Sequence, residues 1–179
     1  SNIYSFSNGG TLRKLLADTN DTTSVIGALT VNPSATRGVG MVFFGSTEKI
    51  FFGDGNGVQK INFNGSGGTS IVGTSSVISD VPRPMAAFLG KVYFGNDNNI
   101  GEIDSTELII TGAKLSPALP GDVTVWDLDT TPDGNYLKIT AMRQNSTGGF
   151  LDGNETSPGA GTESFQYLWN GVDGGVSAF

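Results

Sequence analysis

Three neighbouring aspartates are the first residues of this chain that could do chemistry. Asp127, Asp129 and Asp133 form the pattern D-x-D-x-x-x-D, and Gly134 follows directly. Calcium loops use carboxylate oxygens at alternating positions and a glycine at the sharp turn, so this spacing is close to that of a calcium site. The same residues also suit a hairpin turn in which an aspartate accepts local hydrogen bonds. The three aspartates are therefore the candidate calcium ligands, with a plain turn as the alternative.

Further carboxylates and turns could also bind or react. The runs 53–57 and 95–99 are rich in Gly, Asp and Asn and offer oxygen ligands, although a need for positive φ explains both runs equally well. Glu48, Glu102 and Glu107 are candidates for paired-carboxylate chemistry of the kind hydrolases use. The other interpretation is that these glutamates are solvated strand ends.

Aromatic side chains and one polar stretch are candidates for binding. The aromatic residues that could stack on a sugar, or instead pack between sheets, are Trp126, Tyr136, Tyr167 and Trp169. The stretch 143–163 is long, polar and rich in Gly, Ser and Asn, which predicts a surface loop inserted between two strands. Loops of this kind often carry contacts. The predicted contact residues in it are Asn145, Phe150, Asp152 and Asn154.

The composition excludes several classes of function. The chain has no Cys and no His, which removes thiol catalysis, disulfides, the usual general base and nearly every zinc or iron site. Its net charge of −7 and scattered basic residues argue against a nucleic-acid partner. No apolar run approaches the roughly 18 residues that a membrane-spanning helix needs, so we expect no membrane insertion. We therefore predict a non-enzymatic protein without a resident cofactor, calcium at the aspartates being the exception.

A repeat indicates how these residues are positioned. The segment that starts at Met41 recurs from Met85, and Phe51-Phe52-Gly53 matches Tyr93-Phe94-Gly95 at an offset of 42 residues. Each copy alternates short apolar runs with Gly/Asn/Asp turns, which predicts strand, turn, strand, turn, strand. A repeat of about 40–50 residues made only of short strands is typical of a β-propeller blade.

The repeat divides the chain into four predicted blade segments. They cover roughly residues 1–35, 40–80, 84–115 and 122–179, the last with the insertion 143–163. The predicted strands are 41–44, 49–52, 58–63, 69–73, 85–89, 91–94, 100–103, 108–110, 123–127, 135–142, 165–169 and 176–179, together with two in the first segment. The fold class is thus all-β and propeller-like, with about 3.5 to 4 four-stranded blades. Since 3.5 blades leave a ring open, we expect a part of a larger ring or a ring completed by another chain.

Two runs resemble known propeller families. Lys49–Asn64 (KIFFGDGNGVQKINFN) is similar to the repeat of NHL-type propellers, and Asp127–Ala141 (DLDTTPDGNYLKITA) resembles the Pro-Asp-Gly hairpin of WD40-like propellers. The WD40 Gly-His and Trp-Asp marks are not in their usual places, so the likeness implies architecture and not activity.

The composition also resembles that of bacteriophage virion proteins, which are often acidic, all-β, poor in Cys and His, and rich in Gly, Asn, Ser and Thr. This likeness implies a structural or binding component of a phage tail, located in the virion. Its partners would be other protein chains that complete or pack on the propeller, and a cell-surface carbohydrate or receptor. The alternative is a secreted or periplasmic bacterial propeller that binds carbohydrate or acts as a metal-dependent lactonase-like hydrolase.

Overall fold

The protein is all-β in the part of the chain that the structure describes. The computed structural model describes residues 2–6, 11–16, 24–28, 41–44, 49–54, 57–62, 70–73, 84–143, 163–172 and 175–178, and within them it contains strands and turns but no helix. Short runs of aromatic and β-branched residues form the strands, and Gly, Asn and Asp occupy the turns between them. The predicted all-β class is confirmed.

The described strands pair into four antiparallel sheets. The first sheet joins β1 (Asn2–Phe6), β2 (Thr11–Leu16) and β3 (Ser24–Ala28). The second joins β4 (Met41–Phe44), β5 (Lys49–Asp54), β6 (Gly57–Asn62) and β7 (Ser70–Gly73). The third joins β8 (Met85–Phe88), β9 (Lys91–Asn96), β10 (Asn99–Ile103) and β11 (Ile109–Thr111). The fourth joins β12 (Val123–Thr130), β13 (Leu137–Arg143), β14 (Glu163–Trp169) and β15 (Ser177–Ala178).

Two strands differ most from the sequence prediction, while the other predicted strands differ from it by at most two residues at either end. β3 was not predicted, because its apolar part is only Val25-Ile26 and Gly27 follows it. β12 was predicted to stop at Asp127 but continues to Thr130. Aspartate is unfavourable in strands, yet Leu128 lies between Asp127 and Asp129 and is buried against the third sheet, which favours extension of the strand.

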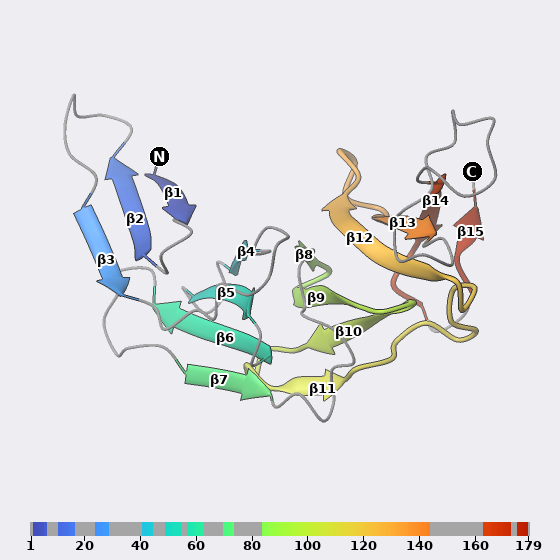
Figure 1. Cartoon of the computed structure of the whole chain (residues 1–179), viewed down its shortest axis with the longest axis horizontal. Helices are drawn as coiled ribbons and strands as arrows, with labels where there is room; N and C mark the ends of the chain where they lie inside the picture. The colour runs from blue at the N-terminus through green and yellow to red at the C-terminus, as the bar shows by residue number, and fades with distance from the viewer. Residues whose placement is uncertain are drawn as a thin grey trace.

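The four sheets follow one another along an arc (Figure 1). In each sheet the strand that comes first in the sequence lies on the inner side of the arc, and the last strand lies on the outside. β4 packs beside β8, and β12 packs beside β8 and β9, so the second, third and fourth sheets contact one another in order. The first and fourth sheets form the two ends of the arc and stand apart in this view.

Two apolar clusters hold the third sheet between its neighbours. Because side chains alternate along a strand, Tyr93 of β9 faces the fourth sheet, while Phe94 faces the second. The cluster towards the fourth sheet is the larger and includes Phe88, Tyr93, Leu137, Ile139 and Trp169. The cluster towards the second sheet consists of Phe51, Val58, Met85, Val92, Phe94 and Ile103.

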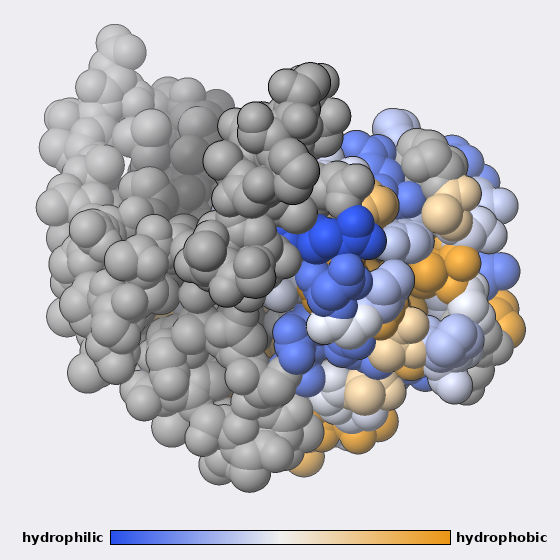
Figure 2. Space-filling model, turned by 45° about the vertical axis from the view of Figure 1, so that its right-hand side comes forward, coloured by the Kyte–Doolittle hydropathy of each residue, from blue (hydrophilic) through white to orange (hydrophobic). Residues whose placement is uncertain are grey.

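The surface of the described part is mixed in character. On the face shown in Figure 2, hydrophilic residues form a band near the middle of the molecule, and hydrophobic residues lie among paler ones towards the right-hand edge. Some large apolar side chains thus lie on the surface, outside the two apolar clusters.

Candidate functional site

The three candidate calcium ligands are divided between a strand and the turn that follows it. Asp127 and Asp129 are exposed residues of strand β12, and only Asp133 lies in the turn that follows. A calcium loop wraps its ligands around the ion, whereas side chains two residues apart on a strand are about 6.6 Å apart along it. Among the described residues, no group of three or more acidic side chains is placed so that it could hold a metal ion.

The carboxylate of Asp133 serves its own turn. The turn 131–134 is closed by a 2.8 Å hydrogen bond from Gly134 N to Thr131 O. Thr131 Oγ1 and Asn135 Nδ2 each donate a 2.6 Å hydrogen bond to the Asp133 carboxylate, and Asn135 N donates another. These hydrogen bonds hold the pKa of the Asp133 carboxyl below its usual value, and the bond from the Thr131 hydroxyl has the largest effect. This geometry is that of the plain-turn alternative.

The predicted contact residues of the insertion, Asn145, Phe150, Asp152 and Asn154, lie outside the described residues. The same holds for Glu48 and for the tip of the 53–57 turn. The described ends of the insertion are adjacent, because Arg143 of β13 pairs with Glu163 of β14. The insertion therefore leaves and re-enters the fourth sheet at one place. Its contact role stays a prediction.

The other two candidate glutamates form ion pairs. Glu102 on β10 is buried, and its carboxylate lies 2.5 Å from Lys91 Nζ and 3.1 Å from Lys114 Nζ. Glu107, in the turn after β10, lies 2.6 Å from Lys60 Nζ of the second sheet. Both carboxylates are thus engaged by lysines, and the second pair also joins two sheets.

Burial divides the candidate aromatic residues. Trp169 and Tyr167 belong to the cluster between the third and fourth sheets, and burial raises the pKa of Tyr167. The Trp169 ring stands edge-on to Tyr93, with the ring centroids 5.2 Å apart, and its Nε1–H donates to Val172 O. Trp126 and Tyr136 are exposed. The four residues therefore do not form one sugar-binding platform, and the alternative of packing between sheets is correct for Trp169 and Tyr167.

The asparagine-rich turn 95–99 acts as a clamp on the connection between the third and fourth sheets. Asn96 Nδ2 donates to Gly112 O and Asn98 Nδ2 donates to Leu119 O. Asn99 exchanges hydrogen bonds with the backbone N and O of Leu115. These side chains fix the segment that leads to β12, so the asparagines of this turn have a structural role.

The ion pair between Lys91 and Glu102 could have been predicted from the sequence. The two-residue turn Asp97-Asn98 sets the register in which Glu102 faces Tyr93 on β9. Lys91 is then the diagonal neighbour of Glu102, within reach of a long side chain. Lys114 follows β11 in an irregular segment, so no strand register predicts its contact with Glu102. The same is true of the clamp formed by Asn96, Asn98 and Asn99.

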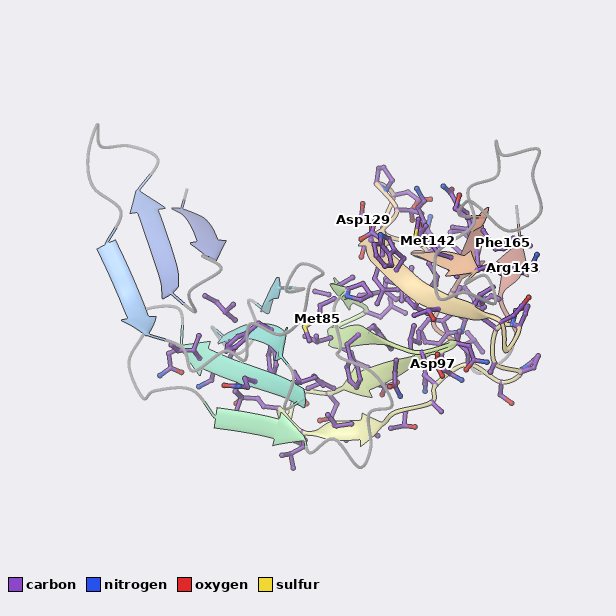
Figure 3. All side chains as sticks on the ribbon, viewed as in Figure 1. Met85, Asp97, Asp129, Met142, Arg143 and Phe165 are labelled. Carbon is purple, nitrogen blue, oxygen red and sulfur yellow. The ribbon has the colours of Figure 1, made fainter. Side chains whose placement is uncertain are left out.

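Arg143 marks the end of the fourth sheet where the insertion begins. Its guanidinium lies over the Phe165 ring, 4.9 Å from the centroid, and its Nε lies 2.6 Å from Asp122 Oδ2 (Figure 3). Asp97 is near this same end of β12, while Asp129 is at the other end (Figure 3). The fourth sheet thus has one end that carries the insertion and one that carries short turns.

Comparison of the sequence with protein families and curated proteins gives no identification. No protein-family description matches the chain, and no curated protein is significantly similar to it in sequence. In the part of the chain that the structure describes, no helix is both long enough and apolar enough to cross a lipid bilayer. Function must therefore be argued from the arrangement of the sheets and from the surfaces that they present.

Proposed function

We propose that the chain is a non-enzymatic scaffold built as part of a β-propeller, whose role is to present loops and turns to other macromolecules. The blades would be the four sheets. The first strand of each would line the axis of the ring, and further protein would complete the circle. In this function the rigid element is the sheet stack, and the variable elements are the turns and the 143–163 insertion.

The observation that carries the proposal is the repeated packing of the sheets. Equivalent faces of successive sheets point the same way: Phe51 of β5 faces the third sheet, and its repeat equivalent Tyr93 of β9 faces the fourth. The inner strands β4, β8 and β12 are neighbours in order, as they are in a propeller. The arc in Figure 1 leaves its two end sheets apart, which is why we expect additional protein to complete the ring.

We propose further that the assembly is a phage virion, with the chain in the tail or facing a receptor. Support comes from the acidic, Gly-rich composition without Cys or His, which resembles that of virion proteins. The alternative of a lactonase-like or carbohydrate-binding secreted propeller has less support. Glu102 and Glu107 are engaged by lysines, and Trp169 and Tyr167 are buried.

The mass of the native assembly tests this function. We expect native mass spectrometry and negative-stain imaging to find a complex far heavier than the 18.6 kDa chain, with sheets arranged radially around an axis. Density that places many copies in a virus particle would support the tail assignment. A stable monomer of 18.6 kDa that unfolds cooperatively would contradict the partial ring.

A further inference from the structure

Exposed large apolar side chains gather at one end of the third and fourth sheets. They occupy all four described turns there: Leu89 between β8 and β9, Leu108 between β10 and β11, Tyr136 between β12 and β13, and Val172 between β14 and β15. Their exposed fractions are 62%, 56%, 40% and 65%. We name these four residues the turn face. Among the described residues, the two other exposed large apolar side chains, Ile110 and Trp126, lie within strands.

The topology places these turns at the same end. In an antiparallel meander, alternate turns share an end, so the β8–β9 and β10–β11 turns lie together, as do the β12–β13 and β14–β15 turns. The sheets run in the same direction, because Thr130 Oγ1 donates to Ala87 O at this end and Val125 N donates to Asp97 O at the other. The turns of the two sheets also meet, since a Cβ on Gly171 would lie 2.4 Å from Leu89 Cδ1.

Leu89 is an unfavourable residue for the turn that it occupies. Leu89 and Gly90 have φ values of 47° and 72°, which is the pattern of a type I′ hairpin turn. Asn-Gly is the favoured pair for such a turn, and a bulky residue at positive φ is unusual and strained. A leucine that is both strained and mostly exposed is not explained by the stability of the hairpin. Such departures are expected where a residue serves binding.

The charges around the turn face favour one kind of partner. Asp104 and Asp133 lie in two of the four turns, and hydrogen bonds from Thr106 and Thr131 hold the pKa values of both carboxyls low, so both are ionised at neutral pH. Lys60 and Lys91 at this end are already paired with Glu107 and Glu102. Lys138, beside the β12–β13 turn, lies opposite Asp129 on the neighbouring strand. Among the described residues at this end the surplus charge is therefore negative, which repels an anionic membrane or a second copy of the same face and attracts a basic surface.

We propose that the turn face docks a protein chain that presents apolar side chains flanked by Lys or Arg. This inference deepens the proposed scaffold function by naming the surface and the partner chemistry. Leu89 and Val172, whose turns touch, are the apolar centre, and the aspartates form the rim.

A displayed library of short random peptides, sorted against the whole protein, tests the proposal. We expect the enriched peptides to combine aliphatic or aromatic residues with Lys or Arg, and to bind more weakly as salt is raised. Their affinity should fall at least about tenfold for the double variant Leu89→Asn, Val172→Ser. Asn suits positive φ, so this variant should still melt cooperatively. The control Ile110→Ser removes an apolar residue that is 54% exposed and lies outside the turn face, and it should change affinity less than about twofold.

Every other outcome contradicts the docking proposal. Failure to enrich any peptide, enrichment of acidic peptides, or equal binding by the double variant would each overturn it. Binding to phosphatidylcholine or phosphatidylserine vesicles that the double variant loses would reassign the turn face to membranes. A dimer in sedimentation equilibrium that the double variant loses would reassign it to self-association. The peptide and vesicle results do not bear on the mass of the native assembly, so the scaffold function stands or falls separately.

Discussion

The third and fourth sheets are built from similar strands but differ in how their two faces are covered. In β9 and β10 of the third sheet, every residue except Lys91 is buried. In β13 of the fourth sheet, buried residues alternate with partly exposed ones. The third sheet lies between two others, whereas among the described residues the fourth sheet packs on the third with one face only. Position in the stack therefore decides whether a strand is buried on both sides.

The outer face of the fourth sheet is polar in a way that the third sheet is not. The polar residues Lys138, Thr140 and Gln166 share that face with the apolar residues Met142 and Leu168. Any protein that packs on the outer face must satisfy these polar groups, because burying them unpaired is costly. A further sheet at this end of the arc would need a hydrogen-bonding surface, unlike the apolar contact between the third and fourth sheets.

Substitutions to alanine in β9 and β13 give the largest test of this difference. We expect Tyr93→Ala and Phe94→Ala each to lower the free energy of unfolding by about 3–5 kcal/mol, because both faces of β9 are buried. In β13 we expect about 3 kcal/mol for Ile139→Ala but less than about 0.5 kcal/mol for its neighbour Thr140→Ala. Urea unfolding measures each value. An equally costly Thr140→Ala would mean that the outer face is covered in the folded protein.

Two glycines test how tightly the third sheet is packed, because one has no room for a Cβ and the other has open space. A Cβ on Gly101 of β10 would lie 2.0 Å from Phe94 Cζ, and Phe94 is fully buried. Gly101→Ala should therefore cost about 2–3 kcal/mol, because the ring has to move within a packed interior. Gly121, in the segment before β12, has open space where a Cβ would stand, so Gly121→Ala should be neutral or slightly stabilising. Equal melting temperatures for the two variants would contradict the tight packing of the third sheet.

Charge removal should also differ between the two sheets. Glu102→Gln leaves Lys91 and Lys114, whose side chains are 38% and 19% exposed, without their carboxylate. We expect a loss of about 1–2 kcal/mol, less than for a fully buried pair because the lysines reach solvent. Asp129→Asn, at an exposed position of β12, should change the unfolding free energy by less than about 0.5 kcal/mol. Chemical unfolding at low and high salt checks both values, and a large salt dependence for Glu102→Gln alone would contradict its burial.

The smallest predicted effect is a pH-dependent loss of stability, and it should be the same for one turn in each of the two sheets. Asp104 in the third sheet and Asp133 in the fourth have lowered pKa values because of hydrogen bonds within their own turns. A carboxyl with a lowered pKa stabilises the fold above its ordinary pKa and loses that contribution as the pH falls through the lower, folded-state value. Asp104→Asn and Asp133→Asn should therefore lower the melting temperature slightly at pH 7 and not at about pH 2. A deficit that persists in acid would point to a cause other than ionisation.

The local elements of the fold could be predicted from the sequence alone. The 42-residue repeat, the apolar runs and the Gly/Asn/Asp turns located all but one of the described strands, because strand formation and tight turns depend on neighbouring residues. A plain turn was one of the two interpretations of Asp133 from the sequence, because a tight turn also depends on neighbouring residues. β3 was missed since its apolar pattern is too short to stand out.

The roles of the side chains, by contrast, depended on how distant segments meet in three dimensions. Asn96, Asn98 and Asn99 bind a connection that lies 16 to 21 residues further along the chain. Glu102 meets Lys114 from an irregular segment, and Trp169 packs against the neighbouring sheet. The gathering of Leu89, Leu108, Tyr136 and Val172 at one end also required the relative direction of two sheets. These contacts join residues that are distant in sequence, and no local pattern encodes which distant segments meet.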